Sequence, residues 1–203
     1  MAEFLAIDTS SKYLTVLAVN GQKQSLRYIE NCAMQHSVIL MDEVDKALSE
    51  AGLTPSDCEF FCAVTGPGSF TGIRIGIATA KGFALGADKP LLSLTSFDMI
   101  AYNVNSENFY VAIDALRGYY YVCGYGRDKK ITIEPSYLGF EEISSFNAPV
   151  YGFEDLPFAN YTKLSPKDCL KSAVLANADK LSDEMHALYV RKSQAEEAKN
   201  DKA

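Results

Sequence analysis

A turn signal near the N-terminus commits the start of the chain to an antiparallel sheet. The Asn-Gly pair at residues 20–21 separates two strand-like runs, residues 13–19 and 22–30. Such a pair predicts a tight hairpin, because both residues tolerate a positive φ. An earlier apolar run, residues 4–7, ends at the Asp-Thr-Ser-Ser cluster of residues 8–11, whose side chains bond nearby backbone and end strands. Three consecutive strands are expected.

Helical and strand-like segments alternate after this unit. Apolar residues recur at helical spacing over residues 36–51, and Gly52 stands where a left-handed residue ends a helix. Because strands that alternate with helices pair in parallel, the first half is expected to be a mixed α/β sheet. The remaining segments predicted in this half are a strand at 59–65, a helix at 72–86, a strand at 90–94, and a helix capped by Thr95 or Ser96 that runs to about Tyr102.

A polar stretch, residues 103–108, suggests a boundary between a domain at 1–104 and a smaller one at 105–203. Each part opens with an apolar strand that ends in an aspartate, Asp8 or Asp114. This echo is a candidate duplication, with coincidence as an equal competitor because the pattern is common. The second part is expected to hold strands at 109–113, 119–125 and 131–133, a helix at 166–178, and a frayed, charged last dozen residues.

Charge and cysteine content restrict the function classes. With 19 basic and 26 acidic residues the formal charge is −7, which argues against capture of nucleic acid by the protein's own field. An odd number of cysteines, five, favours reduced and buried thiols. The N-terminus has no signal-peptide pattern, and no apolar run reaches the length of about 18 residues of a membrane span. We expect a cytoplasmic protein without membrane contact.

The glycine-rich segment at residues 65–76 is the most unusual stretch. Its place before a helix suggests a phosphate cradle, but Ile73 follows Gly72 where a P-loop needs Lys, and Thr71 stands where the dinucleotide fingerprint needs Gly. Small residues instead form a low ridge at four-residue spacing: Gly72, Gly76, Ala80 and Ala84. From spacing alone, packing on the chain's own sheet is favoured over docking against another protein's helix.

Other catalytic patterns are weak. Leu40 stands one turn after His36, so no histidine pair exists there to hold a metal, and His36 and His186 are each expected to be surface or capping residues. No Gly-x-Ser-x-Gly elbow indicates a nucleophile, so an independent peptidase lacks support. Asp8 and Asp114 are a candidate carboxylate pair across a cleft between the halves.

Four segments together resemble the bacterial TsaB (YeaZ) family. They are Asp8-Thr9-Ser10, His36-Ser37, the stretch from Gly66 to Gly76 (Gly-Pro-Gly-Ser-Phe-Thr-Gly-Ile-Arg-Ile-Gly), and Tyr189-Val190-Arg191-Lys192. The resemblance spans essentially the whole chain, and its glycine stretch is highly specific. It implies an α/β fold of the actin-like ATPase and sugar-kinase (ribonuclease H-like) type, with two duplicated domains of which the second is reduced. It also implies a role in adding threonylcarbamoyl to the adenosine beside the anticodon of tRNA.

Proteins of this family are similar to a catalytic paralogue, TsaD, and serve as its non-catalytic partner. The paralogue holds its metal with a His-x-x-x-His pair where this chain has His36 and Leu40. The resemblance thus implies no catalytic residue, metal or cofactor here, and makes Asp8, Thr9 and Ser10 the relic of a phosphate loop. One departure from the family pattern is that Leu116-Arg117, rather than Arg directly, follows Asp114-Ala115.

The resemblance promotes docking as the role of the ridge, because TsaB-like proteins pair with TsaD through helices of the first domain. The predicted partner-binding residues lie on the helices at 36–51 and 72–86: Met41, Val44, Leu48, Gly72, Ile73, Gly76 and Ala80. A ridge sealed inside the chain's own fold would overturn this assignment.

The expected partners are a TsaD-like catalytic subunit and a TsaE-like ATPase, with tRNA reached only through the complex. The chain alone could pair with a second copy through the same ridge. The alternative function is an autonomous ATPase or kinase of the actin-like superfamily that holds Mg-nucleotide around Asp8, Thr9 and Ser10.

Overall fold

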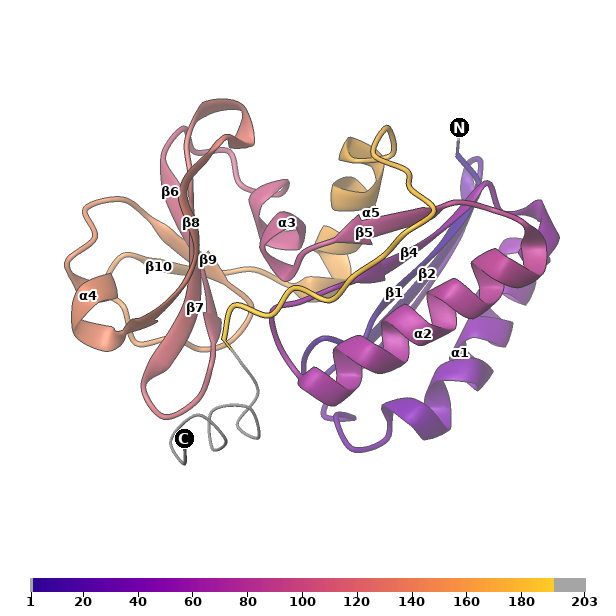
Figure 1. Ribbon diagram of the computed structural model, residues 1–203, viewed down its shortest axis with the longest axis horizontal. Helices are drawn as coiled ribbons and strands as arrows, with labels where there is room; N and C mark the ends of the chain where they lie inside the picture. Colours follow the sequence, from indigo (N-terminus) through magenta and orange to yellow (C-terminus); the bar gives the residue numbers. More distant parts are fainter. Residues whose placement is uncertain (1, 192–203) are drawn as a thin grey trace, which may run out of the picture.

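The structure, a computed structural model, describes residues 2–191 and consists of two lobes, each with a five-stranded sheet (Figure 1). The first sheet contains, in spatial order, β3 (Lys23–Ile29), β2 (Leu14–Asn20), β1 (Phe4–Asp8), β4 (Phe60–Val64) and β5 (Leu91–Leu94). The second contains β10 (Tyr161–Lys163), β9 (Val150–Gly152), β6 (Phe109–Asp114), β7 (Tyr119–Tyr125) and β8 (Ile131–Gly139).

The two sheets have the same topology. In each lobe the first strand is central, pairs antiparallel with the second strand and pairs in parallel with the fourth. The second and third strands form an antiparallel pair, and the fourth and fifth a parallel one. The mixed α/β class predicted from the sequence is confirmed, and the matching strand order supports the duplication that the two aspartate-ended strands suggested.

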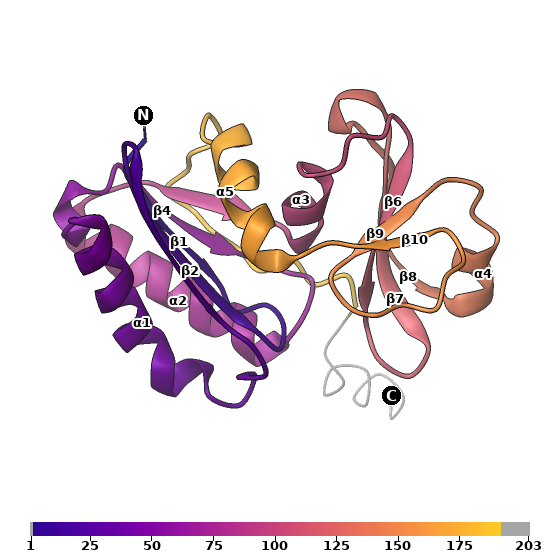
Figure 2. The same cartoon turned by 180° about the vertical axis from the view of Figure 1, so that it is seen from behind.

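Helices cover both faces of the first sheet, whereas the second lobe is reduced. On one face of the first sheet lie α1 (His36–Ala51) and α2 (Phe70–Ala87), and on the other lie α3 (Ser96–Ala101) and α5 (Pro166–Ala176) (Figures 1 and 2). In the second lobe, only the short α4 (Phe140–Ser144) follows β8, and a loop rather than a long helix joins β9 to β10. Two short 3-10 turns are η1 (Pro55–Asp57) and η2 (Arg127–Lys129). Within residues 2–191, no helix combines the length and apolar character needed to span a bilayer.

Turn and helix-cap residues lie at the positions predicted from the sequence. Gly21 has φ 57° in the hairpin between β2 and β3, and Gly52 ends α1 with φ 73°. The side chain of Thr95 accepts a hydrogen bond from the Asp98 amide and caps α3. α2 begins two residues earlier than predicted, at Phe70, because Ser69 provides its N-cap.

The largest differences from the sequence prediction lie in the second lobe. β8 continues past the predicted residues 131–133 to Gly139 and includes Pro135, which is tolerated because β8 is an edge strand. β9, β10 and α4 were not predicted, because elements of three to five residues are too short to show a hydrophobic period.

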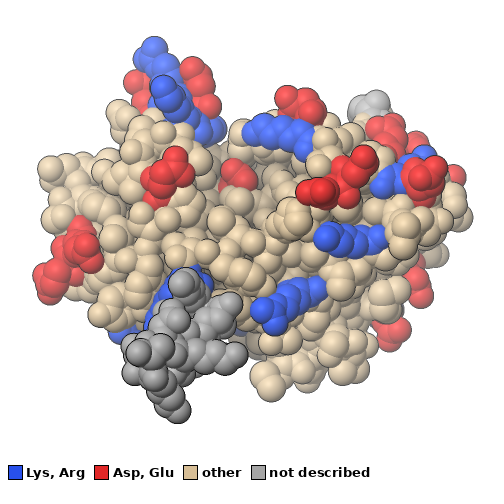
Figure 3. All heavy atoms as spheres, in the orientation of Figure 1, with Lys and Arg blue, Asp and Glu red and all other residues tan. Residues whose placement is uncertain are grey.

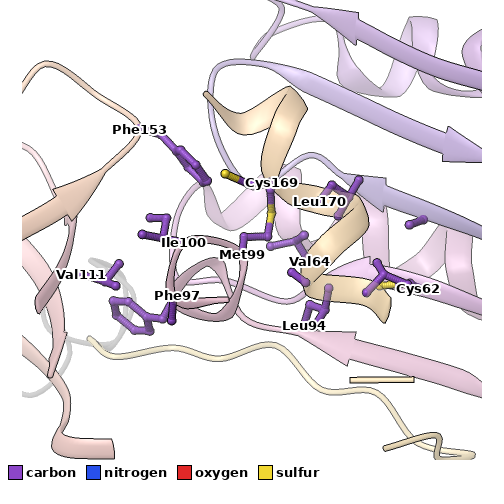
Figure 4. Close-up of a cluster of buried hydrophobic side chains, with 14 of the residues drawn as sticks. Cys62, Val64, Leu94, Phe97, Met99, Ile100, Val111, Phe153, Cys169 and Leu170 are labelled. Atoms are coloured by element: carbon purple, nitrogen blue, oxygen red, sulfur yellow. The ribbon is translucent and has the colours of Figure 1, made fainter. Parts of the chain in front are cut away.

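One hydrophobic core joins the two lobes. Alternate residues of β1 point to opposite faces of the sheet, so that Leu5 and Ile7 pack under α1 and α2 while Phe4 and Ala6 face α3 and α5. The hydrophobic cluster that contains Phe4 and Ala6 continues into the other lobe. Figure 4 shows side chains of β4, β5, α3 and α5 meeting those of the second lobe, among them Val64, Leu94, Phe97, Ile100, Leu170, Val111 and Phe153.

Residues 178–191, the C-terminal segment, return along the first lobe after α5 (Figure 1). Ser182 forms an antiparallel bridge with Leu91, Met185 is buried in the core under α1 and α2, and the Leu188 amide donates to the Thr65 carbonyl at 2.8 Å. The strands divide between the lobes near residue 104, but α5 and this segment pack back onto the first. The domain boundary stays a prediction, and the expected frayed end, residues 192–203, lies outside the described residues.

We predict that the C-terminal segment is part of the first lobe's core. Met185 is 1% exposed, so Met185→Ala should lower the free energy of unfolding by about 2–5 kcal/mol in urea denaturation. Leu181→Ala, at a side chain 41% exposed in the same segment, is the matched control and should change stability by less than about 1 kcal/mol. Equal effects of the two substitutions would show that the segment does not contribute its own core contact.

Candidate functional site

The glycine-rich turn and the loop after β1 are in direct backbone contact. A Cβ atom added at Gly68 would lie 2.1 Å from the Ser10 carbonyl oxygen, and one at Gly72 would lie 1.9 Å from the Thr9 carbonyl oxygen. A Cβ at Gly76 would lie 2.5 Å from the Thr9 hydroxyl. The Ser69 amide donates to the Ser10 carbonyl at 2.7 Å, so backbone hydrogen bonding also requires this approach. The glycines are therefore needed by the fold itself.

The predicted docking role of the ridge is wrong for most of its residues. Gly72, Gly76 and Ala80 face the loop and the sheet beneath α2, and Ile73 is 1% exposed. On α1, Val44 and Leu48 are buried in the core beneath both helices. A second protein cannot contact these side chains while the fold is intact. Of the predicted set, the exposed residue is Met41, at 48%.

The proposed phosphate-loop relic is also turned inward. Asp8 and Thr9 are fully buried and Ser10 is 3% exposed. The Asp8 Oδ1 atom accepts the Ser10 amide at 2.8 Å, and the Thr9 hydroxyl donates to the Gly72 carbonyl at 2.7 Å. Burial raises the pKa of Asp8, so the surroundings disfavour its charged form. These contacts fill the first turn of α2 with protein groups instead of an open anion site.

His36 is a core residue and not the surface or capping residue that was expected. It is 1% exposed, its Nε2 atom lies 3.1 Å from the Tyr13 carbonyl oxygen, and Gln35 holds the N-cap position. Burial lowers the pKa of His36, which favours a neutral ring that donates to this carbonyl. Leu40, one turn later, is 2% exposed. His186, by contrast, is on the surface beside Glu184.

Asp114 repeats the turn of Asp8 at the equivalent strand end. Its Oδ1 atom accepts the Leu116 amide at 2.8 Å, which matches the Asp8 to Ser10 bond in length and sequence separation. Asp114 is exposed while Asp8 is buried, so each carboxylate closes its own turn. These contacts do not bring Asp8 and Asp114 together as the expected carboxylate pair across a cleft.

A cavity of about 500 Å³ lies between the lobes near Tyr13, Tyr28 and Phe153. The Tyr13 ring lies 5.8 Å from that of Tyr28 and 6.2 Å from that of Phe153. Burial raises the pKa of Glu154 in its wall, and nearby Asp114 adds to the effect. The wall also contains Lys12, so charges of both signs face the cavity.

The described part of the chain contains neither an assembled metal site nor a reactive thiol. Residues 2–191 contain no group of three or more His, Cys, Asp or Glu side chains positioned to hold an ion. The five cysteines are free and buried, as expected. Burial raises the pKa of Cys58 and Cys123 to about 11, so these thiols are unreactive at neutral pH.

The exposed side of α2 carries small and apolar residues, and two apolar side chains of α1, Val38 and Met41, are exposed among charged neighbours; of this set the sequence predicted Met41 alone. Leu85 is 87% exposed and Val38 is 75% exposed, and a Cβ added at Gly82 or Gly86 would meet no atom within 4 Å. With Ala78, these glycines form a second row at four-residue spacing on the exposed side of α2. In Figure 3 the surface over this helix is mainly tan. The α2 sequence contains two charged residues, Arg74 and Lys81. We name Val38, Met41, Ala78, Gly82, Leu85 and Gly86 the outer face.

Known proteins can be compared with this chain in sequence and in fold. A family model described as TsaD, tRNA N6-adenosine threonylcarbamoyltransferase, matches residues 29–178. Two solved structures from Pseudomonas aeruginosa, one titled as an uncharacterized protein with similarity to peptidase YEAZ and one as YeaZ, superpose with TM-scores of 0.78 and 0.74 at 23% and 21% identity. They cover 94% and 93% of this chain and are themselves covered completely, which shows the actin-like fold.

Curated relatives match this chain at higher sequence identity than these two structures. The chain is 33% identical over 129 residues to the tRNA threonylcarbamoyladenosine biosynthesis protein TsaB of Escherichia coli, and 32% identical over 146 residues to that of Haemophilus influenzae. These matches cover 62% and 70% of the chain but 55% and 61% of the relatives, so the chain spans little more than half their length. The chain belongs to the actin-like family that the TsaD model defines. Within it, the chain is a member of the TsaB (YeaZ) group.

Two glycines of α2 should respond in opposite directions to the same substitution. Gly72→Ala places a methyl group against the Thr9 carbonyl and should lower stability by more than about 3 kcal/mol or prevent folding. Gly82→Ala meets open space in a helix interior and should raise stability by about 0.5–1 kcal/mol. Thermal unfolding of both variants measures the difference. A tolerated Gly72→Ala would contradict the backbone contact.

The neutral His36 should make stability pH-dependent. Its pKa is lowered in the folded state, so the unfolded chain binds a proton first and stability falls as the pH drops below about 6.5, by up to about 1.4 kcal/mol per pH unit. His36→Gln keeps a donor near the Tyr13 carbonyl and should lose this contribution. Because Asp8 and Glu154 titrate with the opposite sign, the measurement is the wild-type minus variant difference in urea unfolding from pH 7 to 5. A constant difference would show that His36 carries its ordinary pKa.

Proposed function

We propose that this chain takes part in the biosynthesis of threonylcarbamoyladenosine in tRNA as a non-catalytic subunit. It binds and activates a TsaD-like threonylcarbamoyltransferase and works with a TsaE-like ATPase. The names of its relatives support the pathway, since they are tRNA threonylcarbamoyladenosine biosynthesis proteins. The tRNA is the substrate of the complex rather than of this chain alone.

The residues in and around the proposed phosphate-loop relic support a subunit that does not itself catalyse a reaction. His36 is committed to the Tyr13 carbonyl, and Leu40 fills the position where the catalytic paralogue has its second histidine. Asp8 is buried in a setting that disfavours its charge, which suits neither a magnesium ligand nor a general base. The autonomous kinase alternative would need this carboxylate exposed and ionised.

The observation that carries the partner role is the outer face of α1 and α2. Exposed glycines at 82 and 86 let another helix approach closely, while Leu85 and Val38 offer apolar side chains that are 87% and 75% exposed. The TsaD family model spans α1 and α2, so a TsaD-like partner contains corresponding helices. Two such helix pairs can pack in a pseudo-twofold arrangement. The same geometry explains why a second copy of this chain is the competing occupant when the partner is absent.

We predict that Gly82→Arg and Leu85→Arg each prevent co-elution with the TsaD homologue from the same cell. Both positions face open space or solvent, so the arginine blocks docking without entering the core. Leu175→Arg is the matched control, because Leu175 is 47% exposed on α5, on the opposite face of the first sheet. Gel filtration with light scattering gives the stoichiometry of each mixture.

The outcomes of this experiment distinguish a TsaD-like partner from a second copy of this chain as the protein that binds the outer face. Complex formation that survives both outer-face variants would place the interface elsewhere and contradict the proposal. A homodimer of the isolated chain that dissociates in the same two variants would show that the two assemblies compete for one surface. Gly76→Arg is not a useful probe, because a Cβ added at Gly76 would lie 2.5 Å from the Thr9 hydroxyl and the variant would damage the fold.

A further inference from the structure

The second lobe carries a stack of aromatic and arginine side chains outside both the relic site and the outer face. Tyr119 and Tyr137 stack with their ring centroids 4.7 Å apart and their planes 7° from parallel. The guanidinium of Arg191 lies 4.9 Å over the Tyr137 ring, and its Nη1 atom donates to the Tyr137 hydroxyl at 2.9 Å. Tyr119 is 44% exposed, which is unusual for a ring already engaged in stacking.

A hollow of about 340 Å³ opens beside this stack and has a positive lining. Within residues 2–191 its walls are Ala115, Leu116, Arg117, Tyr119, Tyr137 and Arg191, which include two arginines and no carboxylate. We name these six residues the nucleotide platform. The volume lies at the lower end of the range of about 300–1,000 Å³ that small-molecule sites occupy.

The loop between β6 and β7 holds Arg117 at the mouth of this hollow. Leu116, Arg117 and Gly118 all have positive φ, at 69°, 58° and 78°, and the Asp114 carboxylate fixes the turn through the Leu116 amide. Positive φ values are what a tight turn between antiparallel strands requires, and Gly118 adopts one without strain, so the hairpin itself fixes the position of the Arg117 backbone. Arg117 is exposed at the tip.

Among the described residues, the carboxylates of Asp114 and Glu142 lie near the platform, and both accept backbone hydrogen bonds. Asp114 accepts the Leu116 amide, and the Glu142 Oε2 atom accepts the Gly139 amide at 2.9 Å, next to the edge of Tyr119. Neither lines the hollow. A ligand that enters it therefore meets an aromatic face and the exposed guanidinium of Arg117.

We propose that the nucleotide platform binds one unpaired nucleotide of an RNA. The base stacks on the exposed face of Tyr119 and extends the column of Tyr137 and Arg191, while the Arg117 guanidinium contacts the phosphate. Stacking of a base on an aromatic side chain contributes about 1–3 kcal/mol and tolerates any base, and unpaired bases in RNA loops are available for it. Arginine adds bidentate hydrogen bonds to phosphate oxygens.

This inference rests on the proposed function for the identity of the RNA, a tRNA whose modified adenosine lies beside the anticodon. The platform lies in the second lobe and the outer face on the first, so one chain can hold a partner and contact the RNA together. With a net charge of −7 the chain cannot capture RNA strongly alone, so the platform positions a loop that the complex has bound.

The test uses the isolated full chain and a single-stranded octaribonucleotide that carries 4-thiouridine. Photocrosslinking followed by peptide mass spectrometry should place the adduct on Tyr119 or the preceding loop residues 115–118. Tyr119→Ala and Arg117→Ala should each reduce the apparent affinity by about ten-fold. Tyr119→Phe should bind like the wild type, because stacking needs the ring and not the hydroxyl. Arg127→Ala removes an exposed arginine of the same lobe, ion-paired with Glu107, and should change nothing.

Each contrary result overturns the assignment. Without a crosslink at Tyr119 or the loop residues 115–118 at millimolar oligonucleotide, the platform is not an RNA site. Tighter binding of a mononucleotide than of the octaribonucleotide would make it a site for free nucleotides. Binding of a poly-glutamate peptide that depends on the arginines but not on Tyr119 would make it an acidic-peptide site. Co-elution of Tyr119→Ala with the TsaD homologue is scored separately, so a failed platform and a failed partner role are distinguishable.

Discussion

The close approach of α2 to the loop after β1 is the contact on which the first lobe depends. At Gly68, Gly72 and Gly76 the helix and its leading turn meet backbone or hydroxyl atoms of Ser10 and Thr9 at distances that leave no room for a side chain. This approach buries the loop, places Gly72 against the His36 ring, and fills the first turn of α2 with protein groups. The filling of this turn and the packing of the lobe have one geometric cause.

The two lobes behave as one packed body because they share a core. α3 and α5 lie between the sheets, and the cluster that contains Phe97, Leu170, Val111 and Phe153 is continuous across the junction (Figure 4). The C-terminal segment adds ties at both ends, with Met185 in the first lobe and Arg191 on Tyr137 in the second. Domain closure around a ligand would have to break these apolar contacts. The arrangement suits a subunit that presents surfaces more than one that opens and closes a cleft.

α2 shows why most of the predicted docking residues are buried. It carries two rows of small residues at four-residue spacing, one from Gly72 to Ala84 and one from Ala78 to Gly86. The first row packs on the loop and sheet, and the second is open. Spacing defines a row but not the direction in which it faces, and the first row drew attention because it adjoins the conspicuous glycine turn. The exposed residues Leu85 and Val38 had no distinguishing signal in the sequence, because apolar side chains on a helix are usually buried.

The sequence alone determined the α/β class, the opening hairpin, the position of α1 with its Gly52 cap, and the family, because turns, caps and motifs are local and depend on residue type. It could not determine β9, β10 or α4, whose three to five residues become regular only through their neighbours. Tertiary structure alone decided that His36 and Asp8 are buried, that the two aspartates do not pair, and that Tyr119, Tyr137, Arg117 and Arg191 share one hollow. Burial and juxtaposition arise from contacts between segments far apart in the chain, and a linear pattern does not specify which face of an element those contacts will cover.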